Sequence, residues 1–204
     1  MSRQPFFWII DNEWPDYSVE TALLREAWPN CRIEFSGIPF GEDLKRFGAE
    51  ADVVLAQIGA DMNAGVIAQL KNCRGIAVFG GGYDNVDIAA AKVHGIPVTN
   101  VNGYCAEDIA DYVLAVIFHF YKRIAEFSAN AGNGRWGVEA LGAPIHRLGK
   151  QSLLLMGFGH IGSVTARRAG ALGMNVMAYD PYLPEERIRE SGAEPVSLEE
   201  GLRR

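Results

Sequence analysis

The chain has 204 residues, of which 49% are hydrophobic and 22% charged, the composition of an ordinary globular protein. Its net charge of −6, without a cluster of Lys and Arg, argues against a nucleic-acid-binding role. No apolar run approaches the ~20 residues of a membrane span, and the first residues do not have the pattern of a secretory signal. The three widely spaced cysteines fit neither a disulfide framework nor a zinc site. A cytoplasmic protein that binds neither membrane nor metal is therefore expected.

Short apolar runs alternate with helical patterns through the first hundred residues. The expected strands are 6–10, 31–35, 52–56, 75–79 and 96–99. The expected helices are 19–28, 42–47, 63–70 and 88–94. Strands that alternate with helices predict an α/β fold with a parallel sheet covered on both faces, and continuous apolar runs fit strands that are buried on both sides.

The pattern changes at about residue 101, where we place a domain boundary, so that the predicted domains are 1–101 and 102–204. Apolar residues at helical spacing predict one long helix over 106–127, and a loop rich in Gly, Asn and Pro follows over 129–149.

A new strand–helix–strand unit is expected after this loop. Its predicted elements are strands 152–156, 175–179 and 194–196 and helices 160–172 and 184–191. Ser197 with Glu200 three residues later predicts a capping box at the start of a last helix.

A glycine pattern at 157–162, Gly-Phe-Gly-His-Ile-Gly, stands between the first strand and the first helix of this unit. In a dinucleotide-binding fold, Gly157 allows the tight turn, Gly159 leaves room for the pyrophosphate, and Gly162 lets the helix pack closely on the sheet. The N-terminus of the helix then receives the diphosphate. The pattern therefore predicts a nucleotide site; the alternative is a plain strand-to-helix turn.

Asp180 ends the next predicted strand, eighteen residues after Gly162. An acidic residue at this place accepts hydrogen bonds from the adenosine ribose and repels a 2′-phosphate, which favours NAD over NADP; the alternative is a solvated strand end. His160 lies inside the glycine loop, so we expect it to contact the cofactor through its backbone rather than act as a catalytic base.

A second glycine-rich loop, at 80–82, follows the strand predicted at 75–79. Successive backbone N–H groups at the carboxyl end of a strand suit a carboxylate, and a plain glycine turn is the open alternative. Asp87 is expected to cap the next helix, with Gly95 as its C-terminal stop.

Three segments, together with the dinucleotide pattern and Asp180-Pro181, resemble the D-isomer-specific 2-hydroxyacid dehydrogenase family. The segments are GGGYDNVD at 80–87, GIPVTN at 95–100 and ADYVLA at 110–115. The resemblance covers nearly all of residues 50–204, whereas the first fifty residues match in pattern alone.

The resemblance implies a flavodoxin-like parallel-sheet substrate domain over 1–101 and the first part of a Rossmann NAD-binding domain over 102–204. It implies hydride transfer between NAD and a small 2-hydroxy or 2-keto acid, in a homodimer. Gly81 and Gly82 would lie at the substrate carboxylate, and the cofactor would lie against His160, Ile161 and Asp180 besides the three loop glycines. Cys105, at the start of the long helix, would face the cofactor cleft; a small buried residue is the alternative.

The family also uses an Arg, a Glu and a His for catalysis, and the resemblance places all three beyond the position that matches Arg204. No catalytic residue is therefore expected in this chain, which would be a truncated form and inactive by itself. The alternative is a non-catalytic module that binds dinucleotide or a partner, as the corepressors among the family's relatives do. The apolar strand 152–156 is expected at a sheet edge, which favours self-association.

Overall fold

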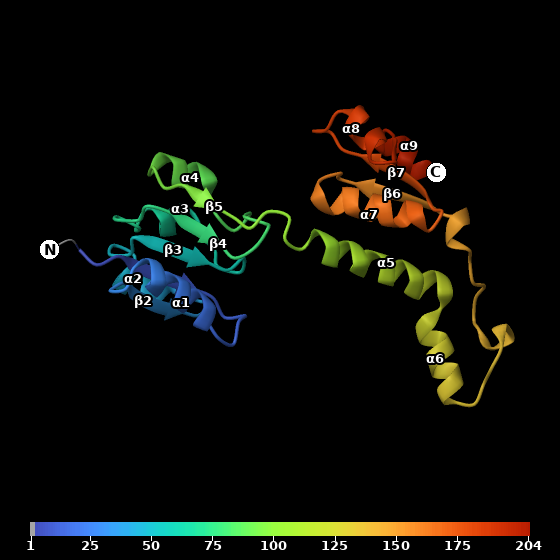
Figure 1. Cartoon of the computed structure of the whole chain (residues 1–204), viewed down its shortest axis with the longest axis horizontal. Coiled ribbons are helices and arrows are strands. Elements are labelled where there is room, and N and C mark those ends of the chain that lie inside the picture. Colours follow the sequence, from blue (N-terminus) through green and yellow to red (C-terminus); the bar gives the residue numbers. More distant parts are fainter. Residues whose placement is uncertain (1–2) are drawn as a thin grey trace. The chain divides into compact units, whose positions relative to one another are not determined.

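Residues 3–204 are described by a computed structural model, in which the chain divides between Asn102 and Gly103 into two units. Both units have the α/β architecture that the alternation of strands and helices predicts (Figure 1). No helix within residues 3–204 is long and apolar enough to cross a membrane.

The first unit is built on a five-stranded parallel sheet with the order β2-β1-β3-β4-β5, which is the flavodoxin-like order. The strands are β1 (Phe6–Ile10), β2 (Arg32–Ser36), β3 (Val53–Ala56), β4 (Ile76–Val78) and β5 (Val98–Thr99). The helices are α1 (Ser18–Ala27), α2 (Gly41–Phe47), α3 (Ala64–Ile67) and α4 (Ile88–Val93). The predicted elements are all present, and α3 is four residues shorter than the expected 63–70.

Strand β1 shows why this sheet is stable. All five of its residues are buried, as expected for a strand covered on both faces. Trp8 is fully buried, and its indole N–H donates a hydrogen bond of 2.8 Å to the Ser36 hydroxyl of β2, because a buried indole needs an acceptor. The edge strand β2 is half-exposed, and α1 has no buried residue, so the burial follows the centre of the sheet.

The second unit contains a three-stranded parallel sheet with the order β6-β7-β8. In the direction from β8 to β6, this order corresponds to strands 3-2-1 of a Rossmann sheet. The strands are β6 (Ser152–Met156), β7 (Asn175–Tyr179) and β8 (Glu194–Pro195). The helices are α5 (Ala106–Lys122), α6 (Ile124–Gly132), α7 (His160–Ala171), α8 (Glu185–Glu190) and α9 (Leu198–Arg203). As expected, β6 lies at an edge of this sheet: its leucines are half-buried and Met156 is 71% exposed.

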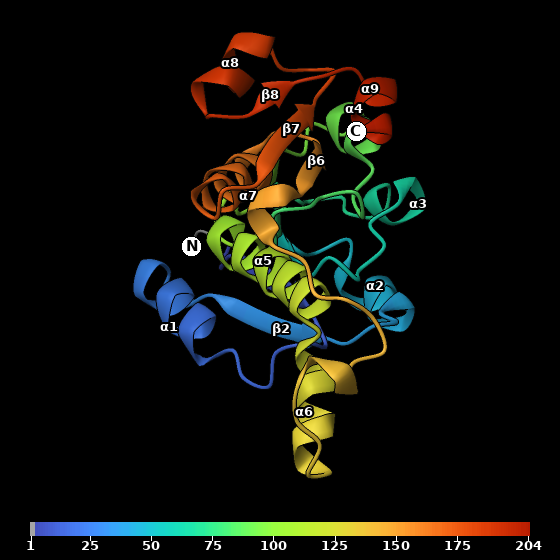
Figure 2. The same cartoon turned by 90° about the vertical axis from the view of Figure 1, so that its right-hand side faces the viewer.

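Helices α5 and α7 lie side by side in both views of the second unit (Figure 1, Figure 2). The Arg168 side chain of α7 joins them, since it donates to the main-chain carbonyl and the carboxylate of Glu107 and to the carboxylate of Asp111.

The single long helix predicted over 106–127 is wrong, because the chain breaks at Arg123, which takes the left-handed conformation at φ 55°. The returning loop supplies the physical reason. The His146 N–H donates to the Tyr121 carbonyl at 3.2 Å, and the Lys122 ammonium donates to the His146 carbonyl at 2.8 Å. The first contact occupies the Tyr121 carbonyl, which in a continuous helix would accept from the N–H four residues later. Helix α6 then extends the helical region to Gly132, into the expected loop.

Two predicted helix caps are confirmed, and one prediction of detail is wrong. The Asp87 carboxylate accepts from the Ala90 N–H at the start of α4, and the Ser197 hydroxyl accepts from the Glu200 N–H at the start of α9. The Glu200 carboxylate does not complete the capping box, because it pairs with the Arg204 guanidinium at 2.9 Å instead.

Candidate functional site

The glycine loop of the second unit turns the chain from β6 into α7. Gly157 has φ +97°, a conformation that side chains rarely adopt, and its N–H donates to the Tyr179 carbonyl of β7 at 2.8 Å. A glycine is therefore required at this position for the turn itself.

The other two glycines of the pattern meet different surroundings. A Cβ atom on Gly162 would lie 2.5 Å from the Gly157 carbonyl oxygen, so the helix can approach the loop this closely only because residue 162 has no side chain. A Cβ atom on Gly159 would meet nothing within 4 Å, and its φ of −73° suits any residue. Gly162 therefore serves the packing of the fold, whereas Gly159 keeps open space above the loop.

This open space lies against the free N-terminus of α7. The first helical hydrogen bond runs from the Ser163 N–H to the Gly159 carbonyl, and within residues 3–204 no acceptor meets the N–H groups of the four residues 159–162. Unpaired amides and the positive end of a twelve-residue helix attract an anion. The chemistry of these donors fits a diphosphate.

Asp180 stands at the end of β7, beside this loop. Its carboxylate accepts hydrogen bonds of 2.8 Å from the Phe158 N–H and from the Tyr182 N–H. These amides, with that of Phe158 as the largest cause, lower the pKa of the Asp180 carboxyl below its ordinary value and keep it ionised. Each oxygen retains a lone pair that can accept a further hydrogen bond, for example from a ribose hydroxyl.

The hydrogen bond between Phe158 and Asp180 is a contact at the candidate site that the sequence does not reveal. The spacing of the motif places Asp180 at the end of the neighbouring strand, but the pattern carries no sign that the carboxylate also holds the glycine loop. The structure thus adds a positioning role to the binding role expected of Asp180.

His160 belongs to this loop, and Cys105 lies at the start of α5. The His160 side chain is exposed at the first turn of α7, and a Cβ atom on Gly103 would lie 3.7 Å from its ring. Cys105 is a half-buried free thiol directly before α5, and its side chain forms no cap hydrogen bond. Ile161, the next residue of α7, is 40% exposed at the same turn.

The glycine loop of the first unit follows β4. Its shape is fixed from β5 and the residues after it, since the Asn100 amide donates to the Gly81 carbonyl at 2.7 Å and the Val101 N–H donates to the Gly80 carbonyl at 2.9 Å. A Cβ atom on Gly80 would lie 2.9 Å from Ile58, whereas one on Gly82 would meet nothing within 4 Å. The carbonyls of Gly80 and Gly81 are thus occupied by hydrogen bonds to residues 100 and 101, and the space beside Gly82 is open to a ligand.

The histidines form neither an ion pair with a carboxylate nor a metal site within residues 3–204. His94, His119, His146 and His160 are all exposed, and none is paired with a carboxylate within residues 3–204. The same part of the chain holds no group of three His, Cys, Asp or Glu side chains arranged for a metal ion.

Comparison with known proteins gives a consistent result. The profile of the family described as "D-isomer specific 2-hydroxyacid dehydrogenase, catalytic domain" matches residues 16–195. D-3-phosphoglycerate dehydrogenase 2, chloroplastic, of Arabidopsis thaliana is 31% identical over 89% of the chain, and hydroxypyruvate reductase of Thermotoga maritima is 36% identical over 71% of it. The chain spans 30% and 46% of these two relatives, less than half the length of each.

Solved structures share the fold. The D-lactate dehydrogenase of Aquifex aeolicus, crystallised with NAD and lactic acid, aligns with a TM-score of 0.78 at 22% identity, covering 96% of this chain and 57% of that one. The TT0316 protein of Thermus thermophilus aligns with a TM-score of 0.75 at 30% identity, covering 96% and 61%.

Proposed function

The chain belongs to the D-isomer-specific 2-hydroxyacid dehydrogenase family, and from this premise we propose that it binds NAD in its second unit and a small 2-hydroxy or 2-keto acid in its first. The observation that carries the proposal is the arrangement around α7: four unpaired amides, the open space at Gly159 and the ionised carboxylate of Asp180. In this assignment the amides hold the diphosphate and Asp180 holds the adenosine ribose.

The charge of Asp180 supports NAD over NADP, because a 2′-phosphate would meet an anion whose pKa is already lowered. Gly157 and Gly162 shape the loop, while His160 and Ile161 offer their backbone amides and Ile161 an apolar side chain. We assign Cys105 to the rim of the same site, as a small residue and not as a nucleophile.

In the first unit, we assign the substrate carboxylate to the loop of Gly81 and Gly82. Bound NAD would supply the acceptor or donor of the hydride. The proposed task of this chain is then to hold the two ligands, since within residues 3–204 no histidine is placed against a carboxylate that could tune it for proton exchange.

We propose, accordingly, that the 204 residues by themselves bind dinucleotide without turnover, while the family's hydride transfer also requires the catalytic Arg, Glu and His. A non-catalytic module that binds dinucleotide or a partner remains the second candidate function, favoured by the exposure of all four histidines. We further propose a homodimer in a reducing compartment such as the cytoplasm, in keeping with three free cysteines.

A titration with NAD tests the cofactor assignment. Gly159→Val should fold like the original protein, because a Cβ atom at this position meets nothing within 4 Å, yet it should weaken NAD binding at least tenfold by filling the place of the diphosphate. Unchanged binding of NAD by a folded Gly159→Val variant would refute the assignment.

A further inference from the structure

The outer edge of β5 is open for pairing with another strand. β5 is the last strand of the first unit's sheet, with Ile76 opposite Val98. The Ile76 N–H donates to the Pro97 carbonyl, and the Val101 N–H donates to the Gly80 carbonyl. Backbone groups alternate in direction along a strand, so the N–H and C=O groups of Val98 and Asn100 face away from β4.

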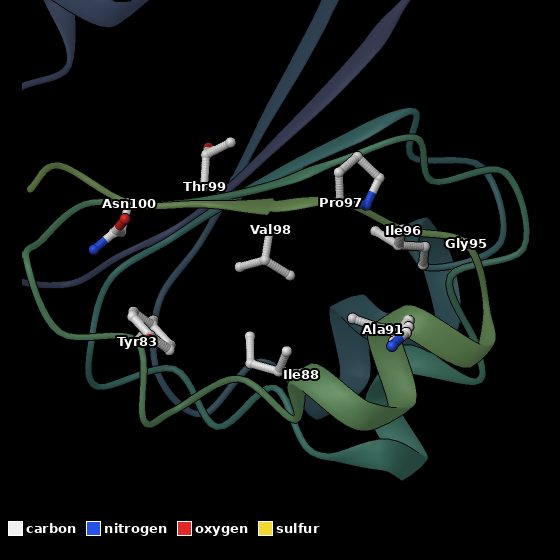
Figure 3. A pocket seen from close by; sticks show the side chains of 10 residues that line it. Tyr83, Ile88, Ala91, Gly95, Ile96, Pro97, Val98, Thr99 and Asn100 are labelled. Atoms are coloured by element: carbon white, nitrogen blue, oxygen red, sulfur yellow. The ribbon is translucent and has the colours of Figure 1, made fainter. Parts of the chain in front are cut away.

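A groove of about 650 Å³ runs along this edge, between β5 and α4. Figure 3 shows Val98 pointing across it toward Ile88, while Pro97 and Thr99 point to the opposite face of the sheet. Ile88 is 42% exposed and Tyr83, at one end of the groove, is 49% exposed. The floor is therefore apolar and accessible at the place where an added strand would put one of its side chains.

Lys92 of α4 gives the groove a charge. It also lines the groove, and within residues 3–204 it forms no ion pair. The lining contains no acidic residue. A second copy of the chain, paired through the same edge, would bring a second Lys92 and no carboxylate to meet it, so a two-fold dimer does not complement this surface.

We propose that this groove binds an extended segment of a partner protein, which adds to the sheet as a strand beside β5. Its main chain pairs with Val98 and Asn100, and two alternate side chains face α4, one apolar against Ile88 and Val98 and one acidic against Lys92. The groove adjoins the glycine loop of the first unit, since Tyr83 lines one end of it and the Asn100 amide donates to the Gly81 carbonyl.

Fluorescein-labelled hexapeptides that alternate threonine with valine and glutamate serve as probes for the full chain. Binding followed by anisotropy should weaken about fivefold in Lys92→Glu, the scale of an exposed ion pair, and remain unchanged in Lys71→Glu, an exposed lysine of the same unit outside the groove. A peptide with lysine in place of glutamate should bind more weakly to the original protein.

Backbone N-methylation tests the strand geometry. Methylation of one alternate set of peptide residues should weaken binding about tenfold through lost main-chain hydrogen bonds, whereas methylation of the other set should be tolerated. The amide resonances of Val98 and Asn100 should shift on titration. The proposal fails if no probe binds at millimolar concentration, if both methylated peptides bind equally, or if Lys92→Glu leaves binding unchanged.

Discussion

The backbone N–H of Phe158 donates a hydrogen bond of 2.8 Å to the Asp180 carboxylate, which ties the glycine loop before α7 to the end of the neighbouring strand β7. The residue proposed to recognise the ribose thus also fixes the loop proposed to recognise the diphosphate. A change at Asp180 should therefore alter both the stability of the loop and the choice of ligand, and the two effects can be separated by experiment.

Substitutions of Gly162 and Gly170, two glycines within α7, should have opposite effects on the free energy of unfolding. Gly162→Ala should destabilise the protein by about 1–3 kcal/mol, because the new Cβ atom would overlap the Gly157 carbonyl oxygen at 2.5 Å. Gly170→Ala in the same helix meets open space and should be neutral or stabilising by up to about 1 kcal/mol. Urea unfolding of the two variants checks this, and a Gly162→Ala variant as stable as Gly170→Ala would contradict the packing described.

The lowered pKa of Asp180 predicts a dependence of stability on pH. A carboxyl whose pKa is lower in the folded state stabilises the fold above its ordinary pKa of 3.8, and this contribution is lost as the pH falls through the folded value. Asp180→Asn should therefore be less stable than the original protein at pH 7, and the difference should shrink below about pH 4. Unfolding curves at pH 7 and pH 3 measure it; a constant difference would show that the ionised form is not the one stabilised.

Much of the candidate site at α7 could be predicted from sequence, because the turn and the close approach of the helix depend on residues that are near one another in the chain. A strand, three spaced glycines and a helix determine the turn at Gly157 and the close approach at Gly162. The break at Arg123 could not be predicted, since it depends on the His146 N–H reaching the Tyr121 carbonyl across 25 residues of chain. The same holds for the hydrogen bond between Phe158 and Asp180, which joins residues 22 positions apart in the chain.

The position of β6 at the edge of its sheet predicts that its amides are weakly protected from hydrogen exchange and that the chain self-associates. β3 is paired on both sides, whereas β6 is paired on one side and exposes Met156. Amides of Val53–Ala56 should exchange much more slowly than those of Ser152–Met156 in the monomeric fraction, and the chain should self-associate at tens of micromolar. Equal protection in both strands, with light scattering that finds monomer alone, would overturn this expectation.

The 204-residue chain should show no measurable reduction of 2-keto acids. Purified protein is assayed with NADH and glyoxylate, hydroxypyruvate or pyruvate, against a control without protein. The expected result follows from the proposed assignment, in which this chain holds the two ligands and the family's hydride transfer also requires the catalytic Arg, Glu and His. Turnover that depends on NADH and exceeds the control would require a catalytic group that we have not assigned.

The central claim, a site for NAD at α7 with Asp180 on the ribose, is tested most directly by calorimetry with ADP-ribose and its 2′-phosphorylated counterpart. The original protein should prefer ADP-ribose, and Asp180→Ala should reduce this preference about tenfold, the scale of a hydrogen bond to a charged group. The ratio of two affinities in one variant is independent of how much that variant is destabilised, and Glu190→Ala, an exposed carboxylate on α8, should leave the ratio unchanged. Equal affinity of the original protein for both ligands would contradict the account.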